Sequence, residues 1–426
     1  MTSLDRRQLV GGAAAIAPLL LAGRAKAAAS AYPALQAVLD SYVAAKKLPG
    51  AVAAVSRAGG PTDILAAGTL AFDSTAPMAA DSLVRVYSMT KPIVGVATMM
   101  LVEQGKLRLD QPLADILPAF GDMQVIVGGD ITKTRPAAGP ILIRHLVTHT
   151  SGLSYNINGD TPLAKAYRHA GLRPGSRGPA APGDADAPKD LEEFGARLAK
   201  LPLDFDPGTK WQYSVAADLM GLVIQHVSGM GFWDFLDSRI FQPLRMGDTD
   251  FEVPASRLPR LTSVVYKTAN GLVTSDDRNS SPFAQGRDLP SGGGGLVSTA
   301  QDYARFNTML LNEGQLGGAR ILRPETVRLA RSNLMPPGVF MRLMGPPNGF
   351  GCFMQVVLPG GSFPGAEPPG SYGWSGAAGT TMWIDPVNSI AVALMVQFMP
   401  PGAYPIYLES RQAAYKDLRA AGVVKS

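Results

Sequence analysis

Two short apolar runs near the start of the chain, at 50–56 and 64–72, are separated by Ala58-Gly59-Gly60-Pro61. Apolar runs on either side of such turn-forming residues predict a β-hairpin. From residue 90 to 103 the spacing changes, and apolar side chains recur at the interval of a helix, with Gly105 placed to end it. The pattern therefore predicts two strands followed by a helix.

Helical spacing continues through the middle of the chain. The predicted helices span 141–148, 191–201, 215–227 and 298–311, and the last of these begins at a capping box, Ser298-Thr299-Ala300-Gln301. Beyond residue 348 the sequence becomes rich in residues that favour strands. The predicted strands there span 350–358, 379–384 and 390–398, and an amphipathic segment at 404–421 follows them.

This order predicts an α/β fold of the α+β type in a single domain, residues 28–426. The first and last strands join most simply in one antiparallel sheet, with the helical middle inserted as a subdomain. We expect the sheet subdomain at about 32–85 and 290–426, and the helical subdomain at about 86–289. Two irregular segments, 173–189 and 359–373, are dense in Pro and Gly. Long loops of this kind form either the rim of a functional site or a disordered spacer.

The first residues are typical of an export signal. Asp5-Arg6-Arg7 leads into an uncharged run from Gln8 to Gly23, which is shorter than the roughly 18–20 residues that span a bilayer. A small-residue cleavage pattern follows at Ala25-Lys26-Ala27. We interpret residues 1–27 as a twin-arginine signal peptide, which predicts a periplasmic or secreted protein with no membrane contact after cleavage. The alternative is an uncleaved anchor.

Composition excludes several classes of protein. The 426 residues are 46% hydrophobic, which excludes general disorder. Of the net charge of +5, the first 27 residues carry +3, so only +2 remains and the chain has no basic footprint for nucleic acid. Cys352 is the single cysteine, so neither an intrachain disulfide nor a cysteine-rich zinc site can form.

The first candidate for catalysis is Ser88-Met89-Thr90-Lys91, at the start of a predicted helix. Residues three apart share one helix face, so the Lys91 amine can reach the Ser88 hydroxyl and take its proton. The helix N-terminus adds backbone N–H groups where an oxyanion would form. This spacing alone is a weak signal, because serine and lysine fall three apart by chance in a chain of this size.

Two later segments add context. Tyr213 comes just before a predicted helix, where a loop tyrosine can point into a cleft. Gly373-Trp374-Ser375-Gly376-Ala377 precedes a predicted strand. The small residues of this segment let backbone N–H groups approach a substrate, as an oxyanion hole requires.

The chain resembles the serine hydrolases of the class C β-lactamase-like superfamily, because five motifs occur in the order found in that superfamily. These are Ser88-Met89-Thr90-Lys91, His149-Thr150-Ser151-Gly152-Leu153, Tyr213-Ser214-Val215, Ser291-Gly292-Gly293-Gly294 and Trp374-Ser375-Gly376. The resemblance implies a β-lactamase/transpeptidase-like fold and no cofactor. It also implies Ser88 as acylated nucleophile, Lys91 as its partner and Tyr213 as proton-shuttling base, with an oxyanion hole from the N–H groups of Ser88 and Ala377.

Two departures from the β-lactamase pattern bear on the substrate. Val215 stands where a β-lactamase has an asparagine, and Trp374-Ser375-Gly376 replaces Lys-Thr-Gly. A β-lactam carboxylate therefore loses a cation and an amide. Both replacements resemble those of the family VIII carboxylesterases, and we expect Trp374, Ser375, Gly376 and Val215 to contact the substrate, with Trp374 and Val215 forming an apolar wall.

A zinc site formed by histidines is a weaker alternative to the serine-based site. His145 and His149 are four residues apart, as in some zinc sites, but no third ligand is evident, so a capping or packing role is favoured and no metal is expected. His226 lies in an apolar helix and is interpreted as structural.

The leading hypothesis is an exported serine esterase that acts on a small-molecule ester through an acyl-enzyme. A D-aminopeptidase, a weak β-lactamase or an acyltransferase on the same fold, and a non-catalytic periplasmic binding protein, stay open. The intact Ser88, Lys91 and Tyr213 set argues against a pure binding protein. Oligomeric state and the natural acyl group and alcohol are not predicted.

Overall fold

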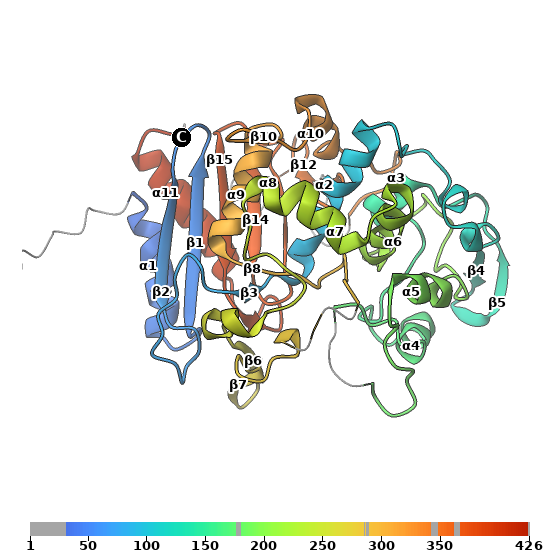
Figure 1. The fold of residues 1–426 in the computed structure, drawn as a ribbon, viewed down its shortest axis with the longest axis horizontal. Helices are drawn as coiled ribbons and strands as arrows, with labels where there is room; N and C mark the ends of the chain where they lie inside the picture. The colour runs from blue at the N-terminus through green and yellow to red at the C-terminus, as the bar shows by residue number, and fades with distance from the viewer. Residues whose placement is uncertain are drawn as a thin grey trace, which may run out of the picture. The chain divides into compact units, whose positions relative to one another are not determined.

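Strands from both ends of the chain form one antiparallel sheet in the computed structural model, which describes residues 31–175, 180–284, 286, 289–341, 348–361 and 367–424 (Figure 1). Within these ranges the sheet has seven strands, in the order β11-β12-β13-β14-β15-β1-β2. Their bounds are β1 Gly50–Arg57, β2 Thr62–Gly68, β11 Asn348–Phe350, β12 Gln355–Val357, β13 Tyr372–Ser375, β14 Thr381–Asp385 and β15 Ile390–Met395.

The predicted hairpin and the predicted union of the two chain ends are confirmed. β1 pairs with β2, and on its other side it pairs with β15 from the end of the chain, with Val52 opposite Met395. All but one of the residues of β1 are buried, since helices cover both faces of the sheet. This explains why the strand is a continuous apolar run rather than an alternating one.

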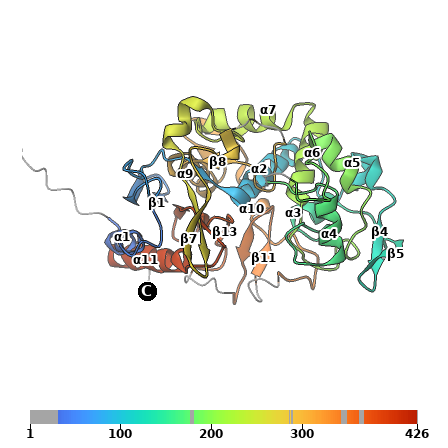
Figure 2. The same ribbon diagram turned by 90° about the horizontal axis from the view of Figure 1, so that it is seen from below.

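One face of the sheet is covered by α1 (Pro33–Ala44) and α11 (Ile406–Ala420), which Figure 2 shows side by side. The other face packs against α9 (Ala300–Leu311), and beyond it lies α2 (Thr90–Glu103). The sequence analysis did not predict α1. Its apolar residues Leu35, Leu39 and Tyr42 lie against the C-terminal part of the chain, which a local pattern does not reveal.

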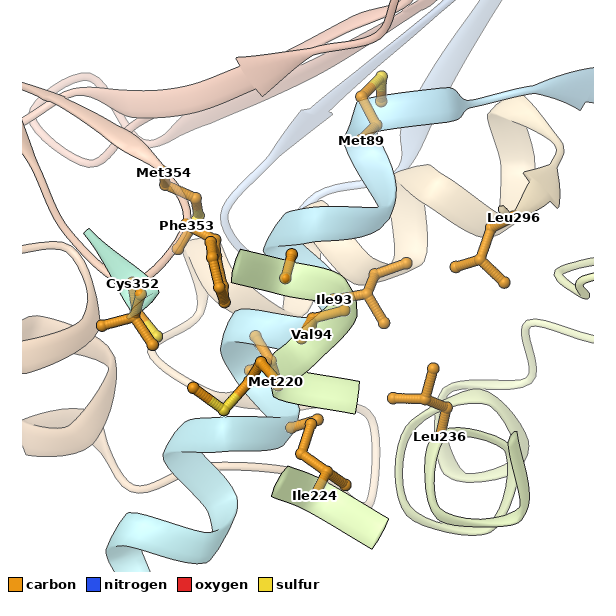
Figure 3. Close-up of a cluster of buried hydrophobic side chains, with 14 of the residues drawn as sticks. Met89, Ile93, Val94, Met220, Ile224, Leu236, Leu296, Cys352, Phe353 and Met354 are labelled. Atoms are coloured by element: carbon orange, nitrogen blue, oxygen red, sulfur yellow. The ribbon is translucent and has the colours of Figure 1, made fainter. Parts of the chain in front are cut away.

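The helical middle is built around α2, whose bounds match the prediction. Its residues from Thr90 to Leu101 are all buried, and Figure 3 shows Ile93 and Val94 among side chains of α6, with Cys352 and its neighbours alongside. The other helices here are α3 Ile143–Val147, α4 Pro162–His169, α5 Leu191–Leu198, α6 Ala216–Ser228, α7 Phe232–Leu236 and α8 Gln242–Leu244, while α10 Pro324–Ala330 lies later in the chain.

Short strand pairs connect these parts. β3 (Val84–Arg85) pairs with β8 (Val297–Ser298) beside the start of α2. β6, β7 and β16 form a second small sheet. The remaining bounds are β4 Gln124–Val127, β5 Asp130–Pro136, β6 Val264–Thr268, β7 Gly271–Asp276, β9 Gln315–Leu316, β10 Ala319–Arg320 and β16 Phe398–Met399.

Three local predictions were wrong. The predicted strand 350–358 is a hairpin of β11 and β12, because Phe353 takes a positive φ of 55° and turns the chain. Thr299, not Ser298, caps α9, since its Oγ1 accepts a hydrogen bond from Asp302 N at 3.1 Å. The segment 359–373, predicted to be irregular throughout, ends inside β13, which begins at Tyr372. The other predicted irregular segment, 173–189, contains no helix or strand in its described part.

The predicted signal peptide, residues 1–27, lies outside the described residues. Among the described helices, none combines the length and the apolar character needed to cross a membrane.

Candidate active site

Ser88 lies in a short 3₁₀ helix, Tyr87–Met89, that connects β3 to α2. The preceding Tyr87 has a positive φ of 43°, a left-handed conformation that is strained for a bulky residue. Such strain costs of order 1–3 kcal/mol and occurs where the surrounding structure holds a functional group in place. Here it sets the direction of the chain as it enters the Ser88 turn.

Ser88, Lys91 and Tyr213 meet at one point. Tyr213 Oη donates to Ser88 Oγ at 2.6 Å, and Lys91 Nζ lies 3.3 Å from the same oxygen. Lys91 Nζ also lies 4.5 Å from the centre of the Tyr213 ring. Lys91 is fully buried, so solvent does not compete for its ammonium hydrogens. The structure thus brings together the three residues for which the sequence predicted catalysis.

A buried acid, Asp218, is linked to Lys91 through the backbone of Gly293. Lys91 Nζ donates to the Gly293 carbonyl at 2.6 Å, and Gly293 N in turn donates to Asp218 Oδ1 at 2.8 Å. Ser291 Oγ donates to the same Asp218 oxygen at 2.6 Å. Burial raises the pKa of Asp218, while the nearby Lys91 and the two hydrogen bonds act in the opposite direction. The sequence analysis missed Asp218, although a lone acid in the apolar start of α6 was a visible signal.

Aromatic rings enclose Tyr213 among the described residues. The ring centres of His149, Tyr155, Trp374 and Trp211 lie 4.9, 5.6, 5.8 and 6.4 Å from that of Tyr213. Burial lowers the pKa of His149 well below its ordinary value, so its imidazole is neutral. His149 Nδ1 pairs with Ser214 Oγ at 3.0 Å, which ties the ring to the residue after Tyr213. This packing holds the phenol in a fixed orientation.

The backbone N–H groups of Ser88 and Ala377 are available as an oxyanion hole, because neither donates a hydrogen bond among the described residues. Both residues line one cavity of about 460 Å³. The loop before Ala377 comes close to the Ser88 segment because Gly376 has no side chain. A Cβ there would lie 2.3 Å from the Val86 carbonyl oxygen. Gly376 is therefore required by its position, as its small size suggested.

The cavity around Ser88 has mainly apolar walls, including Ile157, Phe283 and Met399. Asp276 also lines it, and its carboxylate receives two hydrogen bonds from the buried Arg85 guanidinium, at 2.6 and 2.7 Å. This pair ties the end of β7 to the strand that leads into Ser88. The cavity therefore presents a neutral wall to a substrate.

One of the predicted substrate contacts, Val215, needs correction. Val215 is fully buried at the start of α6, where its N–H donates to Ser154 O, so it cannot form a substrate wall. Trp374, Ser375 and Gly376 line a neighbouring cavity of about 610 Å³ rather than the one that contains Ser88. Trp374 packs between Tyr213 and Phe350, and so borders the site through the Tyr213 ring.

His145 and His226 form hydrogen bonds with other residues of the protein. His145 Nδ1 accepts a hydrogen bond from Leu142 N at 3.1 Å, which confirms a capping role. His226 lies on the exposed side of α6 and pairs with Glu192 at 2.8 Å, rather than facing the core. In the part of the chain that the structure describes, no group of three or more metal-ligating side chains comes together.

A family model described as Beta-lactamase matches residues 35–415, nearly the whole described chain. The chain belongs to the beta-lactamase family. This member of the family is 31% identical to Esterase EstB of Burkholderia gladioli over 411 residues, which cover 91% of this chain and 96% of that esterase. It is 30% identical to the ML-236A carboxylate methylbutanoyltransferase mlcH of Penicillium citrinum over 309 residues, 69% of this chain and 68% of the transferase.

A solved structure extends the comparison. EstCE1, described as a hydrolase with promiscuous acyltransferase activity, superposes with a TM-score of 0.75 at 25% identity. The match covers 90% of this chain and 97% of EstCE1. The predicted superfamily and fold are thus confirmed. Family and relatives together place the protein among the serine hydrolases and acyltransferases of the β-lactamase fold, and they support ester hydrolysis by serine.

Asp218→Ala is expected to lower kcat for an ester by at least about tenfold, with a smaller change in KM. The substitution removes the acceptor for Gly293 N and Ser291 Oγ, so the Gly293 carbonyl no longer holds Lys91 against Ser88. Asp218→Asn is the matched control, because it keeps an oxygen acceptor and should retain most of the activity. Steady-state kinetics of the two variants, together with thermal unfolding, tests this. Equal losses in both would contradict the hydrogen-bond account.

Proposed function

We propose that the protein is a carboxylesterase that hydrolyses uncharged carboxylic esters through an acyl-enzyme on Ser88. The observation that carries the proposal is the convergence of two groups on one oxygen: Tyr213 Oη at 2.6 Å and Lys91 Nζ at 3.3 Å from Ser88 Oγ. A serine hydroxyl becomes a useful nucleophile when an adjacent group accepts its proton, and Tyr213 Oη lies within hydrogen-bond range for that transfer.

In acylation, Tyr213 acts as a phenolate, and the Lys91 ammonium beside its ring stabilises the negative charge. Ser88 Oγ attacks the ester carbonyl carbon while its proton passes to this phenolate. The carbonyl oxygen becomes an oxyanion and accepts hydrogen bonds from the N–H groups of Ser88 and Ala377. The bond between carbonyl carbon and alcohol oxygen then breaks. The leaving oxygen takes the proton from Tyr213, and the acyl group stays on Ser88.

Deacylation repeats these steps with water as the nucleophile. Tyr213 accepts a proton from water as it attacks the acyl carbon, and returns that proton to Ser88 Oγ when the acid leaves. The neutral His149 and the aromatic rings around Tyr213 keep the phenol in position for both half-reactions.

An ester is favoured over a β-lactam by the charge of the site. A β-lactam carries a carboxylate beside its ring, and a charge-assisted hydrogen bond to a cation strengthens binding of such a group. The described residues that line the Ser88 cavity include no lysine or arginine, and Trp374 stands where the β-lactamases have a lysine. An uncharged ester needs only the nucleophile, the proton shuttle and the oxyanion hole.

We expect kcat/KM for p-nitrophenyl butyrate to exceed that for nitrocefin by at least about a hundredfold, on one enzyme preparation. The factor corresponds to the loss of one or two hydrogen bonds to a charged group. Release of p-nitrophenol and opening of the nitrocefin ring are both followed by absorbance. A preference for nitrocefin would overturn the carboxylesterase proposal while leaving Ser88, Lys91 and Tyr213 in place.

Acyl transfer is a second candidate, favoured by the similarity to the methylbutanoyltransferase and to EstCE1. An alcohol would replace water in deacylation and receive the acyl group. Chromatography of the products formed from p-nitrophenyl butyrate in the presence of an added alcohol measures how the acyl-enzyme divides between water and alcohol.

A further inference from the structure

The cavity that contains Ser88 has one charged side chain that the proposed reaction does not use, the carboxylate of Asp276. Asp276 is the last residue of β7. Its side chain is 12% exposed, whereas that of its ion-pair partner, Arg85, is completely buried. Because Asp276 lines the cavity and is still partly exposed, its carboxylate is within reach of a bound substrate.

Arg85 uses only part of the hydrogen-bonding capacity of this carboxylate. Asp276 Oδ1 accepts a hydrogen bond from Arg85 Nη2 at 2.6 Å, and Oδ2 accepts one from Arg85 Nε at 2.7 Å. An ionised carboxylate has about four acceptor positions, two on each oxygen. Each oxygen of Asp276 therefore has capacity for a further donor, and a substrate can supply it.

The charges around Asp276 favour a donor that is uncharged. The Arg85 guanidinium is fixed beside the carboxylate, since it also donates to Ser281 Oγ at 2.8 Å and to the Thr262 carbonyl. The ion pair is neutral as a whole. An ammonium group would place an unbalanced positive charge next to this guanidinium, and burying such a charge is costly. A hydroxyl group donates a hydrogen bond without that cost.

Tyr87 adds a second polar atom to the same part of the cavity. Its ring packs edge-on against Phe283, with ring centres 6.4 Å apart, and both residues line the cavity. Burial raises the pKa of Tyr87 to about 12, with Arg85 lowering and Asp276 raising it, so the phenol keeps its proton close to the ion pair. In the described chain Tyr87 Oη has no hydrogen-bond partner, and it can therefore donate to a ligand.

The direction of proton transfer separates the two parts of an ester. Under the proposed function the leaving alcohol oxygen takes its proton from Tyr213, so the alcohol lies on the side of Tyr213. The Tyr213 ring meets the cavity at Tyr155, with ring centres 5.6 Å apart. Within the described residues no ring contact joins Tyr213 to Tyr87 or Phe283. The wall that contains Asp276 is thus left for the acyl group.

We propose that Asp276 and Tyr87 bind a hydroxyl group on the acyl portion of the ester, and that the enzyme therefore prefers esters of hydroxy acids. The substrate hydroxyl donates to the Asp276 carboxylate and accepts from Tyr87 Oη. Phe283 and Met399 supply apolar surface for the rest of the acyl chain. This inference rests on the proposed function and names the class of its substrate.

Esters that differ by one group on the same carbon test this preference. Ethyl 3-hydroxybutyrate is compared with ethyl 3-methylbutyrate, and ethyl 6-hydroxyheptanoate with ethyl 6-methylheptanoate, using both enantiomers of each hydroxy ester. We expect kcat/KM to favour the hydroxy ester at least about fivefold in one pair or both, because a hydrogen bond to a charged acceptor is gained. Acid release at constant pH measures turnover. A preference for the methyl ester in both pairs, as a purely apolar wall would give, would overturn the inference.

The charge of the donor is tested with the amino ester that matches the preferred hydroxy ester. Its amine is an ammonium group at neutral pH, and we expect a lower kcat/KM than for the hydroxy ester. A preference for the amino ester would overturn the assignment of an uncharged donor. On the alcohol side, 2-hydroxypropyl butyrate and isobutyl butyrate form the matching pair. A hydroxyl preference in this pair and not in the acyl pairs would overturn the placement of the acyl group.

Two variants test the residues themselves through the ratio of kcat/KM for the hydroxy ester to that for its methyl partner. Tyr87→Phe keeps the ring against Phe283 and should lower the ratio at least about threefold. Asp276→Asn should lower it further, with thermal unfolding measured because Arg85 loses its counter-ion. Ile157→Ala, the control, removes an apolar residue of the same cavity and should leave the ratio unchanged. An unchanged ratio in Tyr87→Phe would contradict the proposed contact even if Asp276→Asn did not fold.

Failure of this inference is distinguishable from failure of the proposed function. Ester turnover that persists in Ser88→Ala would overturn the proposed function. Turnover that depends on Ser88 but shows no hydroxyl preference in either acyl pair would overturn only the assignment of Asp276 and Tyr87.

Discussion

Ser88→Ala is expected to lower kcat/KM for p-nitrophenyl butyrate by at least about ten-thousandfold, as removal of a catalytic serine does in other hydrolases. The acyl-enzyme forms on Ser88 Oγ, and no other hydroxyl can take its place between Tyr213 Oη and Lys91 Nζ. Release of p-nitrophenol measures the loss. The same protein should unfold at a temperature close to that of the wild type, because Ser88 is only partly buried.

Ser151→Ala is the matched control for this variant. Ser151 also belongs to one of the five motifs, but its hydroxyl contacts the backbone of Leu153 rather than Tyr213 or Lys91. We expect Ser151→Ala to keep most of the ester turnover. If Ser88→Ala retained activity while Ser151→Ala lost it, the assignment of the nucleophile would be wrong.

Tyr213→Phe is expected to lower kcat by a factor of about 10² to 10⁴, the scale of general acid–base catalysis. The substitution removes the oxygen that lies 2.6 Å from Ser88 Oγ and that, under the proposed function, accepts its proton. The ring itself stays packed against His149, Trp211 and Trp374, so the site keeps its shape. Rapid-mixing kinetics with p-nitrophenyl butyrate separates the acylation rate from the deacylation rate, and both should fall.

Tyr167→Phe serves as the control for Tyr213→Phe. It removes a buried phenol oxygen as well, one that accepts a hydrogen bond from Ser154 N in the helical subdomain. We expect little change in kcat for Tyr167→Phe, although the free energy of unfolding should decrease by about 1 kcal/mol. Near-normal rates in Tyr213→Phe would show that another group moves the proton.

Much of the fold could be predicted because its signals are local. The helix 90–103 has apolar residues at helical spacing and Gly105 after its end, and the structure places α2 over the same residues. The helix α1 was missed because its apolar face packs against α11, far away in the sequence. The hairpin at 348–357 was missed because its turn depends on Phe353 at positive φ, which a bulky residue rarely adopts.

In the candidate site, too, the local features could be predicted from the sequence and the features set by distant contacts could not. Ser88 and Lys91 are three residues apart, in a 3₁₀ turn that continues directly into α2, so their proximity follows from the sequence. The position of Val215 does not, because the start of α6 turns that side chain into the core. The Trp374 ring packs against Tyr213 because β13 pairs with β14 at a particular register, which sets Trp374 opposite Met382 on that face of the sheet. Such register is set by tertiary packing, which neighbouring residues do not encode.

The most direct test of the account is covalent labelling of the nucleophile. The protein is treated with a fluorophosphonate probe, digested, and mapped by mass spectrometry, with Ser88→Ala protein treated in parallel. The account predicts one adduct, on the peptide that contains Ser88, and no adduct on the Ser88→Ala protein. An adduct on Ser151 or Ser375 instead would contradict the assignment of Ser88 as the residue that carries the acyl group.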